Sequence, residues 1–249
     1  MPFAEAWTAG IGYGLQLYFD FSGYSEMAIG MAMMFGLRLP DNFNSPYQAE
    51  NISDFWRRWH MSLSRFLRDY LYIPLGGNRH GFVRGLAALM ATFILGGLWH
   101  GATWTFIAWG ALHGLFVATH RVWTEAGGRM PRCLGMGLTW LSVTFAWVMF
   151  RADTLPQALS LWKGMRGLNG ATVPSAFHQI CPTCVPSTLV TGIGMCAFLT
   201  MMVWCMERPN AMESATSLVP DKRVAIFRDT RNESSDCWVR ERRYRRSLP

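Results

Sequence analysis

The chain has 249 residues, of which 51% are hydrophobic, 14% aromatic and only 16% charged. This is too little charge for an ordinary soluble surface and enough apolar material for several membrane segments, so the composition predicts an integral membrane protein. The formal charge of +7 comes from basic residues in loops and a tail between apolar runs, a pattern that indicates membrane topology and argues against nucleic-acid binding.

The first apolar run predicts two membrane helices, over about residues 6–20 and 24–37, with a polar junction between them. Two carboxylates, Asp20 and Glu26, stand at this junction. Glu26 fits the first turn of the second helix, where the helix dipole favours a negative charge. Asp20 lies among aromatic residues near membrane depth, so it is the better candidate for a functional role.

Residues 38–84 form a polar stretch with seven arginines and no lysine, which predicts a cytoplasmic location. Within it, apolar residues recur at three- and four-residue steps over about residues 51–72. This spacing predicts an amphipathic helix lying in the membrane interface. His60 lies at the edge of the apolar face and can point inward.

A single histidine, His100, interrupts the next apolar region. Helices are predicted over about residues 86–98 and 102–120, with a break at His100. An ionisable group at membrane depth is costly, and irregular backbone there is tolerated only where protein buries it or a water-filled cavity adjoins it. His100 is therefore a site hypothesis, and the alternative is a packing residue that hydrogen-bonds to a neighbouring helix.

Two further spans are predicted, over about residues 134–150 and 188–206. The composition changes abruptly after residue 220, so residues 1–220 are expected to form the membrane unit. Residues 221–249 are expected to form a basic tail that is disordered or bound to the membrane surface. A tail translated from a shifted reading frame is the alternative.

No metal site is predicted, because the sequence has neither a His-Glu-x-x-His motif nor a carboxylate–histidine cluster at ligand spacing. The single pair Cys181 and Cys184 has metal-like spacing, but one Cys-x-x-Cys without a second pair is not specific. For His113 and His120, packing and interface roles are favoured.

His60 and His100 carry the chemical hypothesis, and we expect both to reach one cavity. A neutral imidazole suits general-base work near neutral pH. A second imidazole can polarise a carbonyl or stabilise developing negative charge.

Four motifs carry a resemblance: YFDFSGYSEMAIG from Tyr18, FWRRWHMSLS from Phe55, RDYLYIPLGGNR from Arg68 and GGLWHGATW from Gly96. Over about residues 6–150 the chain resembles the membrane-bound O-acyltransferase family, and within it the bacterial alginate O-acetyltransferase branch. The histidine of the family's Trp-His-Gly motif is catalytic, which implies this role for His100. His60 matches the family's second polar active-site position, which is Asn or His.

The resemblance implies an all-α integral membrane protein: a multi-helix transmembrane bundle with an interfacial amphipathic helix and a broken helix at the catalytic His100. It also implies a multi-pass location in the bacterial inner membrane. Members of this branch are longer and carry transmembrane helices ahead of the first motif, so we expect the chain to be a C-terminal portion.

The implied reaction transfers an acetyl group from a thioester, with acetyl-coenzyme A as donor and no bound cofactor, to a hydroxyl of an exported polysaccharide such as alginate. His100 is implied as the general base, and His60 as the residue that holds or polarises the acyl group. The implied partners are the lipid bilayer, the polysaccharide acceptor and periplasmic acetylation proteins.

Four residues are further candidates for substrate or donor binding: Asp20, Arg57, Arg58 and Trp99. The two arginines beside His60 can pair with donor phosphates. Their alternative role, which the sequence favours, is a positive-inside anchor.

Two alternative functions stay open. The same fold transfers D-alanine to teichoic acid, although the run from Ile73 to Arg79 favours the acetyl branch. A non-enzymatic membrane scaffold or transporter fragment is the other alternative, and the sequence lacks the matched pair of broken-helix repeats that is typical of a transporter.

Overall fold

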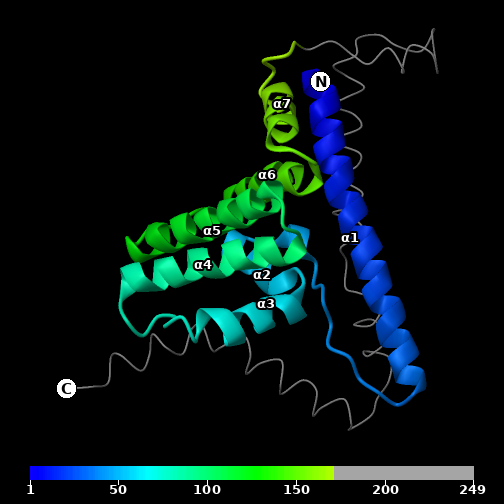
Figure 1. Ribbon diagram of the computed structural model, residues 1–249, viewed down its shortest axis with the longest axis vertical. Helices are drawn as coiled ribbons and strands as arrows, with labels where there is room; N and C mark the ends of the chain where they lie inside the picture. Colours follow the sequence, from blue (N-terminus) through cyan, green and yellow to red (C-terminus); the bar gives the residue numbers. More distant parts are fainter. Residues whose placement is uncertain (171–249) are drawn as a thin grey trace. The chain divides into compact units, whose positions relative to one another are not determined.

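The computed structural model describes residues 1–170, and within them every regular element is helical. The predicted span 188–206, the tail 221–249 and the Cys181–Cys184 pair lie outside the described residues. Figure 1 shows the elements, whose bounds are α1 Phe3–Met34, the 3-10 turn η1 Pro46–Gln48, α2 Ile52–Arg58, α3 Met61–Leu67, the π-helical turn η2 Arg68–Tyr72, α4 Phe82–His100, α5 Trp104–Glu125, α6 Arg132–Arg151 and α7 Leu155–Met165.

The first apolar run forms one uninterrupted helix, α1, rather than the two helices expected over residues 6–20 and 24–37. The junction contains no proline, and a serine or glycine inside a helix costs too little to break it. The expected place of Glu26 in the first turn of a second helix is therefore wrong, because Glu26 lies inside α1. The side chain of the preceding Ser25 is buried, and its Oγ lies 3.4 Å from Nδ2 of Asn42.

The predicted interfacial helix is divided. α2 ends at Arg58, and α3 begins at Met61, so the expected helix over 51–72 breaks at Trp59 and His60. The π-helical turn η2 then completes the segment. Amphipathic periodicity continues across the break, which explains why the spacing of apolar residues did not reveal it.

α4 and α5 form a closely packed antiparallel hairpin that turns at residues 101–103 (Figure 1). Gly97 and Gly110 face each other where the backbones come closest, and a Cβ on Gly97 would collide with the carbonyl oxygen of Phe106. A Cβ on Gly110 would collide in the same way with the carbonyl oxygen of Phe93. Small residues allow this approach, as they do between membrane helices.

α6 packs on the hairpin and on α1 and brings Trp147 into the core, where it is 1% exposed. Its neighbours in the core include Trp59 between α2 and α3 and Trp109 on α5, whose rings lie 5.0 and 6.0 Å from that of Trp147. α7, which the sequence did not predict, packs on α1, and the Trp7 indole N–H donates to the carbonyl of Met165 at 2.9 Å.

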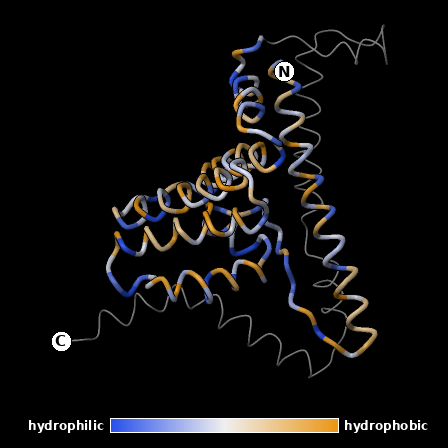
Figure 2. Tube along the Cα trace, in the orientation of Figure 1, coloured by the Kyte–Doolittle hydropathy of each residue, from blue (hydrophilic) through white to orange (hydrophobic). Residues whose placement is uncertain are grey.

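Two of the described helices, α4 and α6, are long and apolar enough to cross a membrane. Hydrophobic residues recur along both, whereas the loop before α4 is largely hydrophilic (Figure 2). Their bounds, Phe82–His100 and Arg132–Arg151, enclose the expected spans 86–98 and 134–150.

Candidate functional site

His100 is the last residue of α4, at the turn of the α4–α5 hairpin. Its half-buried ring stands edge-on to Trp109 at 5.3 Å and to Phe150 at 5.1 Å. Within residues 1–170 no hydrogen bond from another residue occupies its ring nitrogens. Within this part of the chain, the imidazole is therefore held by aromatic packing.

His60 occupies the break between α2 and α3 and has a left-handed backbone, with φ 43° and ψ 56°. A positive φ is uncommon in residues other than glycine, although histidine adopts it more often than most, so the surrounding structure must hold this conformation in place. The carbonyl of Asn42 accepts from the Met61 amide at 3.0 Å, and the Asn44 amide donates to the carbonyl of Arg58 at 3.0 Å. Residues 42–44 thus bind the backbone on both sides of His60.

The Asn42 side chain also determines which nitrogen of the neutral His60 ring carries the proton. Its Oδ1 accepts from Ser62 Oγ at 2.6 Å and lies 3.3 Å from His60 Nδ1. An amide oxygen only accepts hydrogen bonds, so this contact requires the proton on Nδ1 and leaves Nε2 of the neutral ring as an acceptor. Burial, with a smaller contribution from the charge of His100, lowers the pKa of His60 to about 4, so the ring is neutral at pH 7.

The two histidines belong to one aromatic environment. His60 stands edge-on to Phe21 of α1 at 4.6 Å. Its neighbour Trp59 contacts Trp147, which contacts Phe150, the residue packed on His100. A chain of ring contacts thus runs from the residue next to His60 to the ring of His100.

Two of the other candidate residues stand differently with respect to these histidines. Trp99 is 66% exposed, and its ring lies 5.0 Å from that of His100. Asp20 is exposed on α1, where the next residue, Phe21, is the one that reaches His60. The described structure therefore does not bring the Asp20 carboxylate to the histidines.

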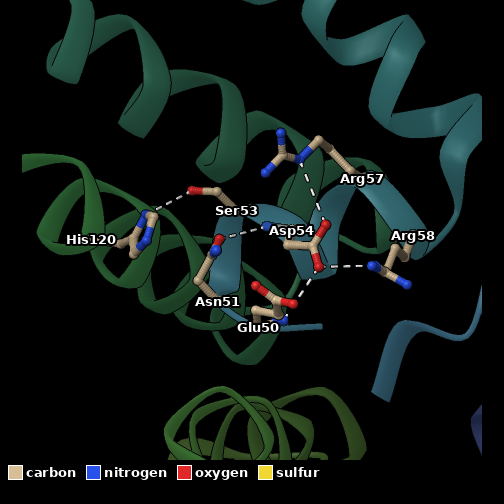
Figure 3. A network of polar contacts seen from close by, with 7 residues as sticks. All are labelled: Glu50, Asn51, Ser53, Asp54, Arg57, Arg58 and His120. Carbon is tan, nitrogen blue, oxygen red and sulfur yellow. Dashed lines mark hydrogen bonds and ion pairs between the residues drawn. The ribbon is translucent and has the colours of Figure 1, made fainter. Parts of the chain in front are cut away.

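Arg57 and Arg58 both face Asp54, but at different distances (Figure 3). Arg58 Nε lies 2.9 Å from Asp54 Oδ2, whereas Arg57 Nε lies 3.9 Å from Asp54 Oδ1. The same carboxylate accepts from the Glu50 amide at 3.3 Å, while the Asn51 side chain accepts from the Asp54 amide at 2.9 Å. This reciprocal cap fixes the start of α2 and engages Arg58 more closely than Arg57.

Two histidines to which the sequence assigned packing roles make hydrogen bonds between α2 and α5. The Trp56 indole N–H donates to Nδ1 of the fully buried His113 at 3.2 Å. Ser53 Oγ and His120 Nδ1 are hydrogen-bonded at 3.1 Å (Figure 3). Neither bond is visible in a motif, because each joins positions more than fifty residues apart.

The motif that ends in Gly76-Gly77-Asn78-Arg79 has a structural role. The Tyr72 hydroxyl donates to Asn78 Oδ1 at 2.7 Å, and Arg121 of α5 donates to both residues. Gly77 has a positive φ of 50°, which fits glycine at this turn. These contacts join the loop before α4 to α5.

Residues 1–152 match the family described as MBOAT, membrane-bound O-acyltransferase family. A peptidoglycan O-acetyltransferase of Helicobacter pylori is 51% identical over 177 residues, which cover 70% of this chain and 34% of that protein. A probable alginate O-acetylase of Pseudomonas aeruginosa is 49% identical over 162 residues, covering 65% and 31%. A teichoic acid D-alanyltransferase of Bacillus subtilis is 32% identical over 149 residues, covering 56% and 38%.

The chain spans about a third of the length of these curated relatives. The family match covers well over half of the chain and includes all the residues assembled around His60 and His100. The chain belongs to the membrane-bound O-acyltransferase family.

Proposed function

We propose that this chain carries the catalytic histidine of an O-acetyltransferase that modifies an exported polysaccharide. The observation that supports this function best is the placement of His60 and His100 in one aromatic environment, although they come from separate elements. Relatives about half identical to the chain are named for acetylation of alginate and of peptidoglycan. The acceptor in this proposal is therefore a sugar hydroxyl of such a polymer.

In the proposed reaction, a ring nitrogen of neutral His100 takes the proton from the acceptor hydroxyl while the oxygen attacks the thioester carbonyl carbon. The new C–O bond forms a tetrahedral intermediate, which collapses as the C–S bond breaks. The imidazolium of His100 then returns its proton to the leaving thiolate. Acetyl-coenzyme A fits this reaction as the donor, because its thiol is the leaving group.

His60 takes a different role from the one implied by the resemblance. With its proton on Nδ1 toward Asn42, the neutral ring presents Nε2 as an acceptor and has no second N–H to donate to an acyl carbonyl. We assign His60 to the acceptor side, where Nε2 accepts a hydrogen bond from a sugar hydroxyl and orients it. Orientation of a reacting hydroxyl is a large part of enzymatic rate enhancement.

Arg57 is the better of the two arginine candidates for the donor phosphates. It is exposed and lies farther from Asp54 than Arg58 does. Arginine pairs with phosphate through charge-assisted hydrogen bonds. Its alternative role as a positive-inside anchor predicts a change in topology, not in donor affinity, when it is removed.

The apolar helices α4 and α6 support a multi-pass location in the bacterial inner membrane. In this proposal the donor approaches from the cytoplasm, the acceptor polymer lies on the other side, and periplasmic acetylation proteins are partners. Transfer of D-alanine to teichoic acid is the second candidate, supported by relatives such as the Bacillus subtilis enzyme at 32% identity.

The proposal is tested by the acetyl content of the exported polymer in cells that carry His100→Ala in place of the unchanged protein. We expect acetylation to be abolished while the protein still inserts into the membrane. His80→Ala is the matched control, because His80 is exposed in a loop. Unchanged acetylation in the His100 variant would contradict the catalytic assignment, and D-alanine in place of acetyl would support the second candidate.

A further inference from the structure

Two hydrogen bonds link α2 to α5: Trp56 Nε1 to His113 Nδ1 at 3.2 Å, and Ser53 to His120 at 3.1 Å. We call this pair the α2–α5 histidine ladder. The two bonds lie about one helical turn apart along α2, so together with the packing of Phe55 on His113 they restrict both the position and the rotation of α2 on α5.

The Trp56–His113 bond, which we call the inner rung, is completely enclosed at its His113 end. His113 is 0% exposed, with Phe55 stacked on its ring at 6.4 Å and Trp109 edge-on at 5.0 Å. Because Nδ1 accepts from Trp56, the neutral ring carries its proton on Nε2, which has no partner in the described part of the chain. The bond to Trp56 is therefore the polar contact that orients this buried imidazole.

Both ends of the inner rung lie close to the candidate catalytic histidines. On α2, Trp56 precedes His60 by four residues, and the helix ends between them. On α5, Trp109 precedes His113 by four residues, and its ring contacts His100 at 5.3 Å. A change at the Trp56–His113 bond therefore affects both the segment that carries His60 and the part of α5 that packs on His100.

We propose that the α2–α5 histidine ladder sets the position of His60 relative to His100, with Trp56 and His113 as positioning residues. Neither residue touches the reacting atoms in this assignment. The segment of α2 and α3 carries His60, and the α4–α5 hairpin carries His100. The Trp56–His113 bond holds this segment against the hairpin. The predicted effect on turnover rests on the proposed acyl transfer. The predicted position of His60 relative to His100 does not.

The geometric test measures cross-linking in a chain with His60→Cys and His100→Cys, using a short bis-methanethiosulfonate reagent. Trypsin then releases residues 59–65 and 85–121, neither of which contains a native cysteine, and mass spectrometry quantifies the linked pair. We expect Trp56→Phe, which removes the indole N–H but keeps an aromatic ring, to lower the linked yield severalfold. Trp162→Phe is the matched control, because it also removes an indole hydrogen bond, to the carbonyl of Phe145 at 3.0 Å.

Equal yields in the Trp56→Phe and unchanged backgrounds would overturn the proposal. Cross-linking needs no turnover, so it tests the geometry even if the acyl-transfer assignment fails. The two failures can therefore be told apart.

The kinetic test compares His113→Asn, which keeps an acceptor near the position of Nδ1, with His113→Leu, which fills a volume similar to that of histidine but has no acceptor. A positioning role predicts that the leucine variant loses about tenfold to a hundredfold in kcat, the scale expected for misplaced reacting groups. It further predicts an unchanged KM for the thioester donor and partial recovery of kcat in the asparagine variant. Equal losses in both variants, with a common shift in thermal unfolding, would show a merely structural role and overturn it.

Discussion

The two candidate catalytic histidines are held by different interactions: His100 by aromatic packing, and His60 by hydrogen bonds to its ring and to the backbone on both sides of it. His100 stands at the turn of a hairpin whose helices meet at glycines, and aromatic rings pack against its imidazole. His60 sits in a left-handed break that is maintained by hydrogen bonds from the segment around Asn42. The hairpin should therefore respond mainly to changes of volume, and the break mainly to changes of hydrogen bonding and backbone freedom.

The largest expected effect is on the hairpin. Gly97→Ala places a Cβ against the backbone carbonyl of Phe106, which has no flexible end to move aside. Overpacking of this kind costs about 1–3 kcal/mol or more, so we expect a marked fall in thermal unfolding temperature in detergent. Gly12→Ala is the control, because a Cβ there meets nothing within 4 Å. A Gly97 variant as stable as the control would show that the helices are not closely packed.

A second comparison separates the His60 ring from its backbone. His60→Ala and His60→Gly both remove the imidazole, so both should lose acyl transfer. Only alanine keeps the strain of a left-handed residue, a difference of about 1 kcal/mol. We therefore expect the glycine variant to be the more stable in thermal unfolding. Equal stability would show that position 60 does not hold this conformation.

The pH dependence of stability tests the environment of His60. Its pKa is about 4 in the folded protein, against 6.5 for the free side chain. The unfolded chain then binds more protons between these values, so the contribution of His60 to stability is complete above about pH 6.5 and declines as the pH falls toward 4. In His60→Asn this part of the decline should disappear. An identical pH profile in both proteins would contradict the assigned burial.

The smallest effects are expected at the two arginines. Arg58→Ala removes a partly exposed ion pair with Asp54 at 2.9 Å, which contributes about 0–1 kcal/mol. We expect a slight loss of stability and little change in kinetics. Arg57→Ala should instead raise the KM for the thioester donor, measured in membranes with topology verified by protease accessibility. The reverse pattern would assign donor binding to Arg58.

The sequence predicted the apolar helices around His100 better than the break at His60. Runs without charge located α4 and α6 to within a few residues, because hydropathy alone determines such helices. The break at His60 escaped because its cause is Asn42, eighteen residues earlier and outside any motif. A left-handed residue held by tertiary hydrogen bonds has no local signal.

Two other differences have identifiable reasons. α1 continues through residues 20–26 because serine and glycine do not interrupt helical hydrogen bonding strongly enough. α7 was missed although its start carries a signal: Thr154 accepts from the Gln157 amide at 3.4 Å, and the Gln157 side chain accepts from the Asp153 amide at 2.9 Å. This reciprocal cap matches the threonine-to-glutamine spacing that marks a helix start.

We claim that His60 and His100 act in one site, and a double-mutant cycle on acyl transfer shows whether they do. The kcat/KM values of the unchanged protein, His60→Asn, His100→Asn and the double variant would be measured in the same membranes. A shared site predicts strong non-additivity, with the double variant little worse than the His100 variant alone. Losses that simply add would contradict the claim and place the two histidines in independent roles.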